Sequence, residues 1–205
     1  MNGAASAPTY LIPHDRIDRS RGTHGMLWFI VTEATLFVML FFSYFYLRHF
    51  ATQWMPEPPA LTPALSMLAV LLSSSAVLHF GEVSVRRGHE ATARLAIVLT
   101  IALGLAFLAI QASEYREELR HVRPTDDAYG SMFYVITGIH GLHVVLGLLM
   151  LSFVLVLPRI GANDRPPHHP LKNAALYWHF VDAVWIVIVA ILYLLPRMKL
   201  SFHCA

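Results

Sequence analysis

Five long apolar stretches alternate with short polar links along the chain. Each stretch approaches or exceeds the roughly 20 residues that an α-helix needs to cross a bilayer. They predict transmembrane helices over 25–48, 64–85, 95–115, 131–157 and 174–195. The pattern therefore predicts an all-α integral membrane protein, a bundle of five transmembrane helices over 24–196, with a polar tail at 1–23 and a short tail at 197–205.

Composition agrees with this pattern. Hydrophobic residues make up 56% of the 205 residues and charged residues 14%, whereas soluble domains carry about 25% charged residues. Residues 1–23 contain no apolar stretch of the kind a signal peptide requires, so we expect membrane insertion to begin with the first apolar helix.

The basic residues predict which way the helices cross the membrane. Nine lie on the side of the N-terminus, namely Arg16, Arg19, Arg21, Arg86, Arg87, Arg94, Arg159, Arg165 and Lys172. Six lie on the other side, namely Arg48, Arg116, Arg120, Arg123, Arg197 and Lys199. Since cytoplasmic loops carry the excess of Lys and Arg, the N-terminus is expected in the cytoplasm and the C-terminus outside.

Several kinds of site are not expected. Cys204 is the single cysteine, so it can form neither an intrachain disulfide nor a cysteine-based metal centre. No C-x-x-C-H motif for covalent haem attachment occurs. The net charge of +2 is small and spread over both sides, which gives no basis for nucleic-acid binding.

Polar and ionisable side chains inside the apolar stretches are the candidate functional residues, because such groups are costly in hydrocarbon. The predicted topology sorts them into an inner layer of Glu33, His79, Glu82, His179 and Asp182. The outer layer holds Gln111, Glu114, His140 and His143. Four pairs are spaced i,i+3 and so share a helix face. We expect Glu33 to approach His179 or Asp182, and Glu114 to approach His140 or His143.

These residues fit more than one role. Hydrogen bonds between helices are the commonest use of polar groups in a membrane bundle. A metal or haem site is less favoured, because His-x-x-His on one helix is a weak signal without further ligands. A proton relay needs carriers throughout the membrane, and the sequence indicates two separate layers instead. Glu33 lies ~14 Å into the first helix at about 1.5 Å per residue, where it could bond a neighbouring helix, line a lipid cleft or modulate proton supply to a partner.

Four stretches carry a resemblance to a known family. They are GMLWFIVTEATLFVMLFFSYFYLR (25–48), QASEY (111–115), YGSMFYVITGIHGLHVVLGLLML (129–151) and YWHFVDAVWIVIVAILYL (177–194). In order and spacing they resemble helices of cytochrome c oxidase subunit III, and the patterns GxHGLHVxxG and YWHFVDxVW are long and specific. The usual form of that family has seven helices. This chain is similar to its short five-helix bacterial form, which lacks the first two helices and therefore one wall of the family's lipid-holding cleft.

The resemblance implies a function and partners. It implies a non-redox accessory subunit of a haem–copper terminal oxidase in the bacterial inner membrane, with haem and copper in partner subunits. The chain would contact catalytic subunit I directly, accompany subunit II, stabilise subunit I and support proton uptake and oxygen access in aerobic respiration. Phospholipid is the ligand it could bind itself. Glu33 matches the family's intramembrane carboxylate, and no residue is expected to be catalytic. The signature motifs contain His140, His143, Trp178, His179 and Asp182.

Other functions stay open at this point. The chain could serve a quinol oxidase or be the homologue associated with nitric oxide reductase. From a different class, a dihaem b-type membrane anchor would also have five helices and intramembrane histidines; His79 and His179 could pair on the inner side, whereas His140 and His143 share one helix. A free-standing transporter is disfavoured, because the chain shows no internal repeat.

Overall fold

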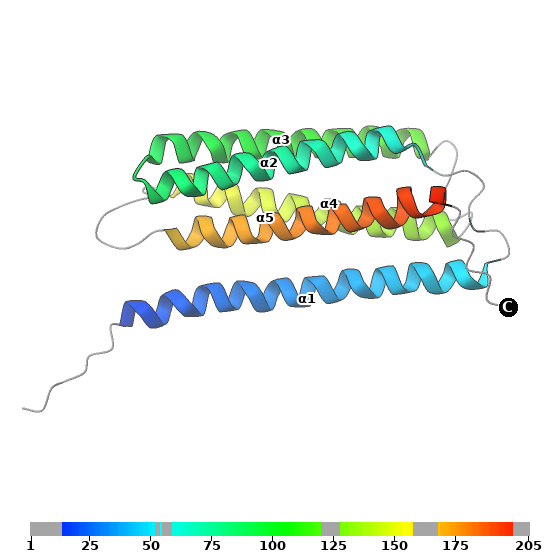
Figure 1. The fold of residues 1–205 in the computed structure, drawn as a ribbon, viewed down its shortest axis with the longest axis horizontal. Helices are drawn as coiled ribbons and strands as arrows, with labels where there is room; N and C mark the ends of the chain where they lie inside the picture. Colours follow the sequence, from blue (N-terminus) through cyan, green and yellow to red (C-terminus); the bar gives the residue numbers. More distant parts are fainter. Residues whose placement is uncertain (1–13, 52–53, 55–58, 120–127, 158–167, 199–205) are drawn as a thin grey trace, which may run out of the picture.

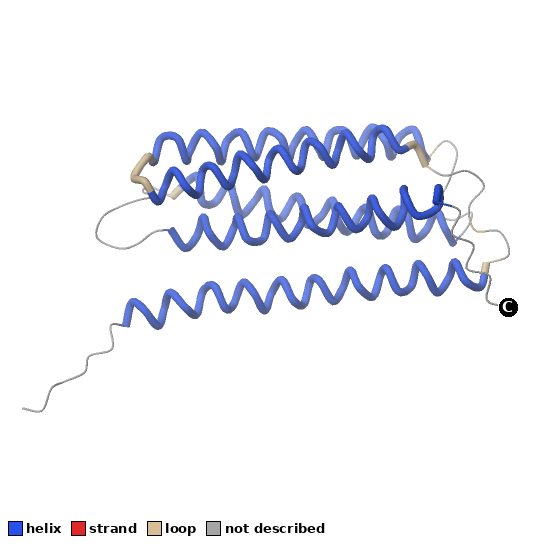
Figure 2. Tube along the Cα trace, viewed as in Figure 1, coloured by secondary structure: helices blue, strands red, loops and turns tan. Residues whose placement is uncertain are grey.

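The computed structural model describes residues 14–51, 54, 59–119, 128–157 and 168–198 (Figure 1). The five main helices are α1 (His14–Phe50), α2 (Leu61–Arg86), α3 (Glu90–Glu118), α4 (Ala128–Val156) and α5 (His168–Ile188). The chain after α5 continues as a π-helical turn, η1 (Val189–Leu194), and a 3-10 turn, η2 (Leu195–Met198). Within these ranges there is no strand (Figure 2), and all five helices are long and apolar enough to span a membrane. The predicted all-α fold is confirmed.

The helices run up and down in a bundle, and α1 stands apart at one edge of it (Figure 1). α2 pairs with α3 along one side, α4 pairs with α5 next to them, and α1 packs against α4 and α5. The turn between α2 and α3 is tight and passes through Gly88, whose φ of 82° is a conformation that glycine adopts without strain. α1 is the least buried of the five helices and α5 the most.

Helices α1 to α4 are longer than the apolar stretches that predict them, and α5 begins six residues before its stretch. α1 begins at His14, so part of the predicted polar tail is helical, and α3 begins at Glu90 rather than near residue 95. The polar residues at these ends can extend the helices because an existing helix gains one hydrogen bond for each further residue that joins it. Pro63 and Pro170 lie in the first turns of α2 and α5, where a missing N–H costs nothing. Residues 1–13, most of the link between α1 and α2 (52–53 and 55–58) and Cys204 lie outside the described residues.

The change of helix type at the end of α5 follows from Pro196. A proline there cannot donate to the carbonyl four residues earlier, and its ring crowds that carbonyl, so a regular α-turn is excluded. Arg197 satisfies backbone acceptors at this end: it donates to the carbonyl of Tyr193 and, across the bundle, to that of Pro59, both at 2.6 Å. The link between α1 and α2 is thereby tied to the end of the last helix.

Trp178 of α5 occupies the centre of the four-helix part of the bundle and is fully buried. A Cβ placed on Gly104 of α3 or on Gly147 of α4 would come within 2.8 Å of its ring. Small residues therefore let three helices close around the indole. Its Nε1–H donates to Ser74 Oγ of α2 at 2.9 Å, which gives the ring's only polar atom a partner.

Candidate functional site

The structure joins Glu33 of α1 to His143 of α4. Glu33 Oε2 lies 2.9 Å from His143 Nε2, and His143 Nδ1 lies 2.7 Å from the carbonyl oxygen of Ile139 in its own helix. Phe37 covers the imidazole edge-on, with ring centroids 4.9 Å apart. This contact is a hydrogen bond between the membrane-spanning centres of α1 and α4, and both side chains are mostly buried.

Hydrogen positions in this pair are constrained by chemistry. A carbonyl oxygen only accepts, so His143 must donate to Ile139 from Nδ1. If the ring is neutral, Nε2 is then an acceptor and Glu33 must be the protonated donor. If the ring is cationic, Nε2 donates to a Glu33 carboxylate. In either state one proton is shared between the two residues and their combined charge is zero, which suits a pair inside a membrane.

The expected partners of Glu33 were therefore wrong. It contacts His143, which we had assigned to the outer layer, rather than His179 or Asp182. α4 spans Ala128–Val156, so His143 lies near its midpoint, and Glu33 lies close to the middle of the spanning part of α1. An error of a few residues in helix boundaries is enough to move a side chain from one predicted layer to another, at about 1.5 Å per residue.

His140 lies one turn from His143 on α4 and is used differently. It is completely buried, and neither ring nitrogen has a hydrogen-bond partner within the described part of the chain. Its ring stacks on Trp185 with centroids 4.9 Å apart and meets Phe107 edge-on at 5.7 Å. Among the described residues His140 therefore acts as an aromatic core residue rather than as a member of the predicted polar network.

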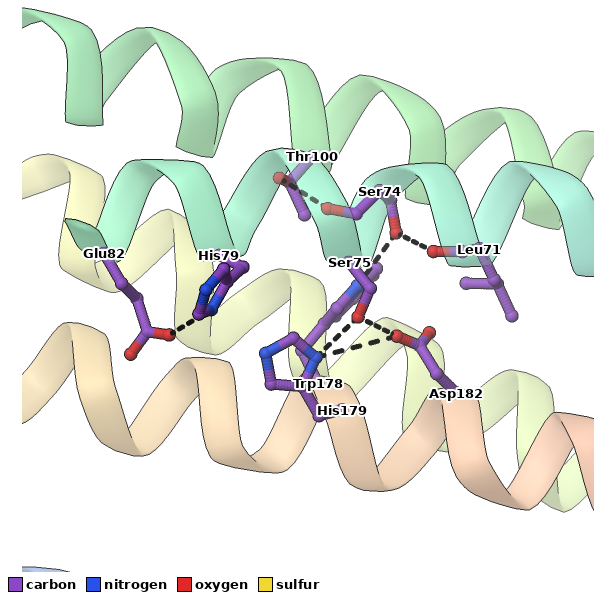
Figure 3. Close-up of polar contacts among 9 residues, drawn as sticks. All are labelled: Leu71, Ser74, Ser75, His79, Glu82, Thr100, Trp178, His179 and Asp182. Carbon is purple, nitrogen blue, oxygen red and sulfur yellow. Dashed lines mark hydrogen bonds and ion pairs between the residues drawn. The ribbon is translucent and has the colours of Figure 1, made fainter. Parts of the chain in front are cut away.

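A second polar cluster joins α2 to α5 (Figure 3). Ser75 Oγ lies 2.5 Å from His179 Nδ1 and donates a hydrogen bond to Asp182 Oδ2. A hydroxyl that donates to the carboxylate accepts from the ring, so a continuous chain of hydrogen bonds runs from His179 through Ser75 to Asp182. The two α5 residues are spaced i,i+3 as predicted, and they meet at one serine of the neighbouring helix.

His79 and Glu82 continue this cluster along α2. His79 Nδ1 lies 3.8 Å from Glu82 Oε2, and the two are again spaced i,i+3. In Figure 3 both lie toward one end of the cluster, on the same side of α2 as Ser75. We call the five residues of this stripe the polar seam: Ser75, His79 and Glu82 of α2, with His179 and Asp182 of α5.

Gln111 and Glu114 belong to a third polar region, between α3 and α4. Gln111 Nε2 donates to the carbonyl of Thr137 at 2.8 Å, and a Cβ on Gly141 would lie 2.8 Å from the Gln111 side chain. Tyr115 OH lies 2.6 Å from Thr137 Oγ1. Glu114, Gln111 and Tyr115 line a cavity of about 10 Å³, about the size needed for one water molecule.

Sequence reasoning missed Ser75, Ser74 and Thr137, each of which bonds a predicted residue, and Tyr115, which bonds Thr137. The signal for the two serines is the run Ser73–Ser75 inside an apolar helix. Hydroxyls in membrane helices often bond their own backbone, as Ser74 also does toward Leu71, so the run alone did not indicate interhelical contacts. Among the described residues no group of three or more His, Cys, Asp or Glu side chains is placed to hold a metal ion.

Comparison with known proteins gives a consistent result. A family model described as cytochrome c oxidase subunit III matches residues 5–196. The chain is 39% identical over 178 residues to cytochrome c oxidase subunit 3 of Synechocystis sp., covering 83% of this chain and 74% of that protein. It is 36% identical over 177 residues to the protein of the same name from Thermostichus vulcanus, covering 84% and 87%. The corresponding Xenopus laevis protein is 37% identical over 179 residues, covering 83% and 68%.

Proposed function

The chain belongs to the cytochrome c oxidase subunit III family, and from this we propose that it is the non-redox accessory subunit of a haem–copper terminal oxidase. In this role it packs on catalytic subunit I in a complex that also contains subunit II. It stabilises subunit I and supports proton uptake and oxygen access, while haem and copper reside in the partner subunits. The observation that carries the proposal is the family match over residues 5–196.

The state of the histidines supports a non-redox role. An axial haem ligand needs a ring nitrogen that faces a slot wide enough for a porphyrin. His140 is enclosed by Phe37, Phe107 and Trp185. Both nitrogens of His143 are engaged by Glu33 and Ile139. These contacts argue against His140 and His143 as haem ligands of a dihaem b-type anchor.

The Glu33–His143 pair is the group in this chain best suited to proton exchange. The shared proton can reside on either partner without a change in net charge, as the hydrogen-bond geometry requires. The side chain of Glu33 is 23% exposed, so the pair is not sealed from its surroundings. We assign to Glu33 the modulation of proton uptake by the complex, acting through its neighbours rather than as a catalytic residue.

A groove between α1, α4 and α5 supports phospholipid binding. It has a volume of about 410 Å³, and its walls are mostly apolar. Its lining residues are Met26, Leu149, Met150, Phe153, Val154, Pro170, Asn173 and Ala174. The acyl chain of a phospholipid fits this groove, because it would contact apolar side chains along its length. A lipid-filled groove would also offer an apolar route for oxygen toward a partner subunit.

The proposed setting is the inner membrane of a bacterium, with the N-terminus in the cytoplasm. The distribution of basic residues supports this orientation. Arg86 and Arg87 in the short α2–α3 turn and Lys172 near the start of α5 lie at the same end of the bundle as the start of α1 (Figure 1).

The proposal is tested by affinity purification of the tagged chain from its native membrane in mild detergent. Mass spectrometry of the eluate should identify a haem–copper subunit I, and a reduced-minus-oxidised spectrum should assign all haem to that partner. Haem bound to this chain after removal of its partners, or a flavin dehydrogenase in place of subunit I, would refute the proposal. The identity of the co-purifying subunits also separates a cytochrome c oxidase from a quinol oxidase.

A further inference from the structure

The two imidazoles of the polar seam, His79 and His179, are exposed at a depth where hydrocarbon is expected, whereas Asp182 beside them is buried. His79 precedes the end of α2 by seven residues, or ~10 Å at about 1.5 Å per residue. α2 has 26 residues and is ~39 Å long at the same rise, against a hydrocarbon core of about 30 Å. His79 therefore lies inside the apolar layer. Its side chain is 69% exposed and that of His179 is 39% exposed.

Each exposed imidazole is only partly satisfied by its own chain. Nδ1 of His79 pairs with Glu82, and Nδ1 of His179 bonds Ser75 (Figure 3). Among the described residues no hydrogen bond engages Nε2 of either ring, which leaves both atoms for a further partner. Lipid tails offer no hydrogen-bonding group, and polar side chains in membrane proteins face a protein interior or a water-filled cavity. The seam needs a partner that can hydrogen-bond to it.

The outward side of α4, by contrast, does not need a hydrogen-bonding partner. The outward side of α4 presents aliphatic and aromatic side chains with high exposure: Leu142, Val145, Leu146, Leu149 and Phe153. Leu149 precedes the end of α4 by seven residues, as His79 does in α2, and its side chain is 62% exposed. His79 and Leu149 thus lie at the same depth with similar exposure, but the first is polar and the second is apolar.

The polar seam also leads into a groove on the surface of the bundle. Glu82 lines a groove of about 300 Å³ between α2 and α5, together with Val85, Arg86, Leu171 and Lys172. The groove combines an apolar floor with two cations and one carboxylate at the end of the bundle that carries the start of α1. Such a mixture suits a protein segment with an acidic or amide side chain, because charge complementarity sets the register of an interface.

We propose that the polar seam is the face through which this chain attaches to another transmembrane subunit of the oxidase. A helix of that subunit lies along α2 and α5, places a hydrogen-bonding side chain opposite His79 and His179, and presents an acidic or amide group to Arg86 and Lys172. The inference rests on the proposed function as an accessory subunit and adds which face makes the contact. The outward face of α4 is left to lipid.

Site-specific photo-crosslinking in the intact complex tests this. The photoreactive residue p-benzoylphenylalanine replaces His79 in one variant and Leu149 in a control matched in depth and exposure. After irradiation of native membranes and purification through a tag on this chain, we expect a protein adduct to an oxidase subunit from position 79, at least fivefold more abundant than from position 149. Position 149 should yield lipid adducts.

Each of the other outcomes either supports or overturns the proposed attachment face. Lipid adducts alone at position 79, in a complex that still contains subunit I, would overturn the attachment face while leaving the accessory-subunit proposal intact. A stronger protein adduct at position 149 would do the same. Absence of any oxidase subunit from the wild-type purification would instead refute the accessory function and the inference with it. Loss of the complex in the position 79 variant alone, with the position 149 variant assembled, would support the seam as the interface.

Discussion

The two polar clusters of the bundle differ in how completely the chain itself surrounds them. In the Glu33–His143 pair, Phe37 covers the imidazole and both ring nitrogens have partners within the chain, Ile139 and Glu33. In the polar seam Ser75 joins His179 to Asp182, but the second carboxylate oxygen of Asp182 is buried without a partner among the described residues, and both imidazoles are exposed. Buried polar groups in membranes hold helices together. The comparison teaches that the first cluster fastens α1 to the bundle, whereas the second is built to meet another protein.

Trp178 packs at the centre of the bundle beside the polar seam, and removing its ring should have the largest effect. Trp178→Ala opens a cavity between Gly104 and Gly147 and leaves Ser74 without its donor, next to Ser75 of the seam. We expect a loss of about 3–5 kcal/mol in the free energy of unfolding. Thermal unfolding of the purified chain in detergent measures it. Trp28→Ala is the control, since Trp28 is 71% exposed; equal losses in the two variants would contradict a central role for Trp178.

Substitution of the two histidines of α4 should change the free energy of unfolding by less than Trp178→Ala, and by different amounts. His143→Phe removes the bond to Ile139 and leaves Glu33 unpaired, for an expected loss of about 1–3 kcal/mol. His140→Phe keeps the stacking on Trp185 and breaks no hydrogen bond to the described residues, so it should be nearly neutral or stabilising. Unfolding of the two variants side by side checks the order. A larger loss for His140→Phe would show that this residue has a polar partner after all.

The smallest effects concern Glu33. Glu33→Leu should cost about 1 kcal/mol, the scale of one hydrogen bond between membrane helices. Glu33→Gln should cost less than about 0.5 kcal/mol, because its amide N–H can donate to Nε2 of a neutral His143. The same glutamine cannot share a proton with the ring, so oxidase activity in the assembled complex should decay faster during turnover than in wild type. If the activity of Glu33→Gln decays no faster than that of wild type, Glu33 has only a packing role.

Much of the fold could be predicted from the sequence, because a bilayer demands long apolar helices and the chain contains five stretches of that length. The pairing of polar side chains could not. Membrane helices are apolar on every side, so hydrophobicity does not reveal which face of α1 or α4 is inside. Glu33 was therefore assigned to the wrong partner, although both it and His143 were recognised as candidates.

Local chemistry explains the other differences. Pro196 was visible in the sequence, yet the π-helical form of the turn before it was not predicted. The contact of Arg197 with the Pro59 carbonyl joins residues 138 positions apart, which no periodicity indicates. His140 resembled a ligand or network residue by type and spacing. Its aromatic surroundings come from α1, α3 and α5, and only the assembled bundle brings these together.

The most direct test of the contrast between the two clusters is the amount of this chain that remains bound in the purified oxidase. The ratio of this chain to subunit I would be measured by quantitative mass spectrometry for the double variant His79→Leu/His179→Leu and for Glu33→Leu. We predict that the double variant inserts in the membrane but falls well below a one-to-one ratio, while Glu33→Leu stays near one-to-one. Full retention of the double variant together with loss of Glu33→Leu would show that the α1 side, and not the polar seam, holds the subunit in the complex.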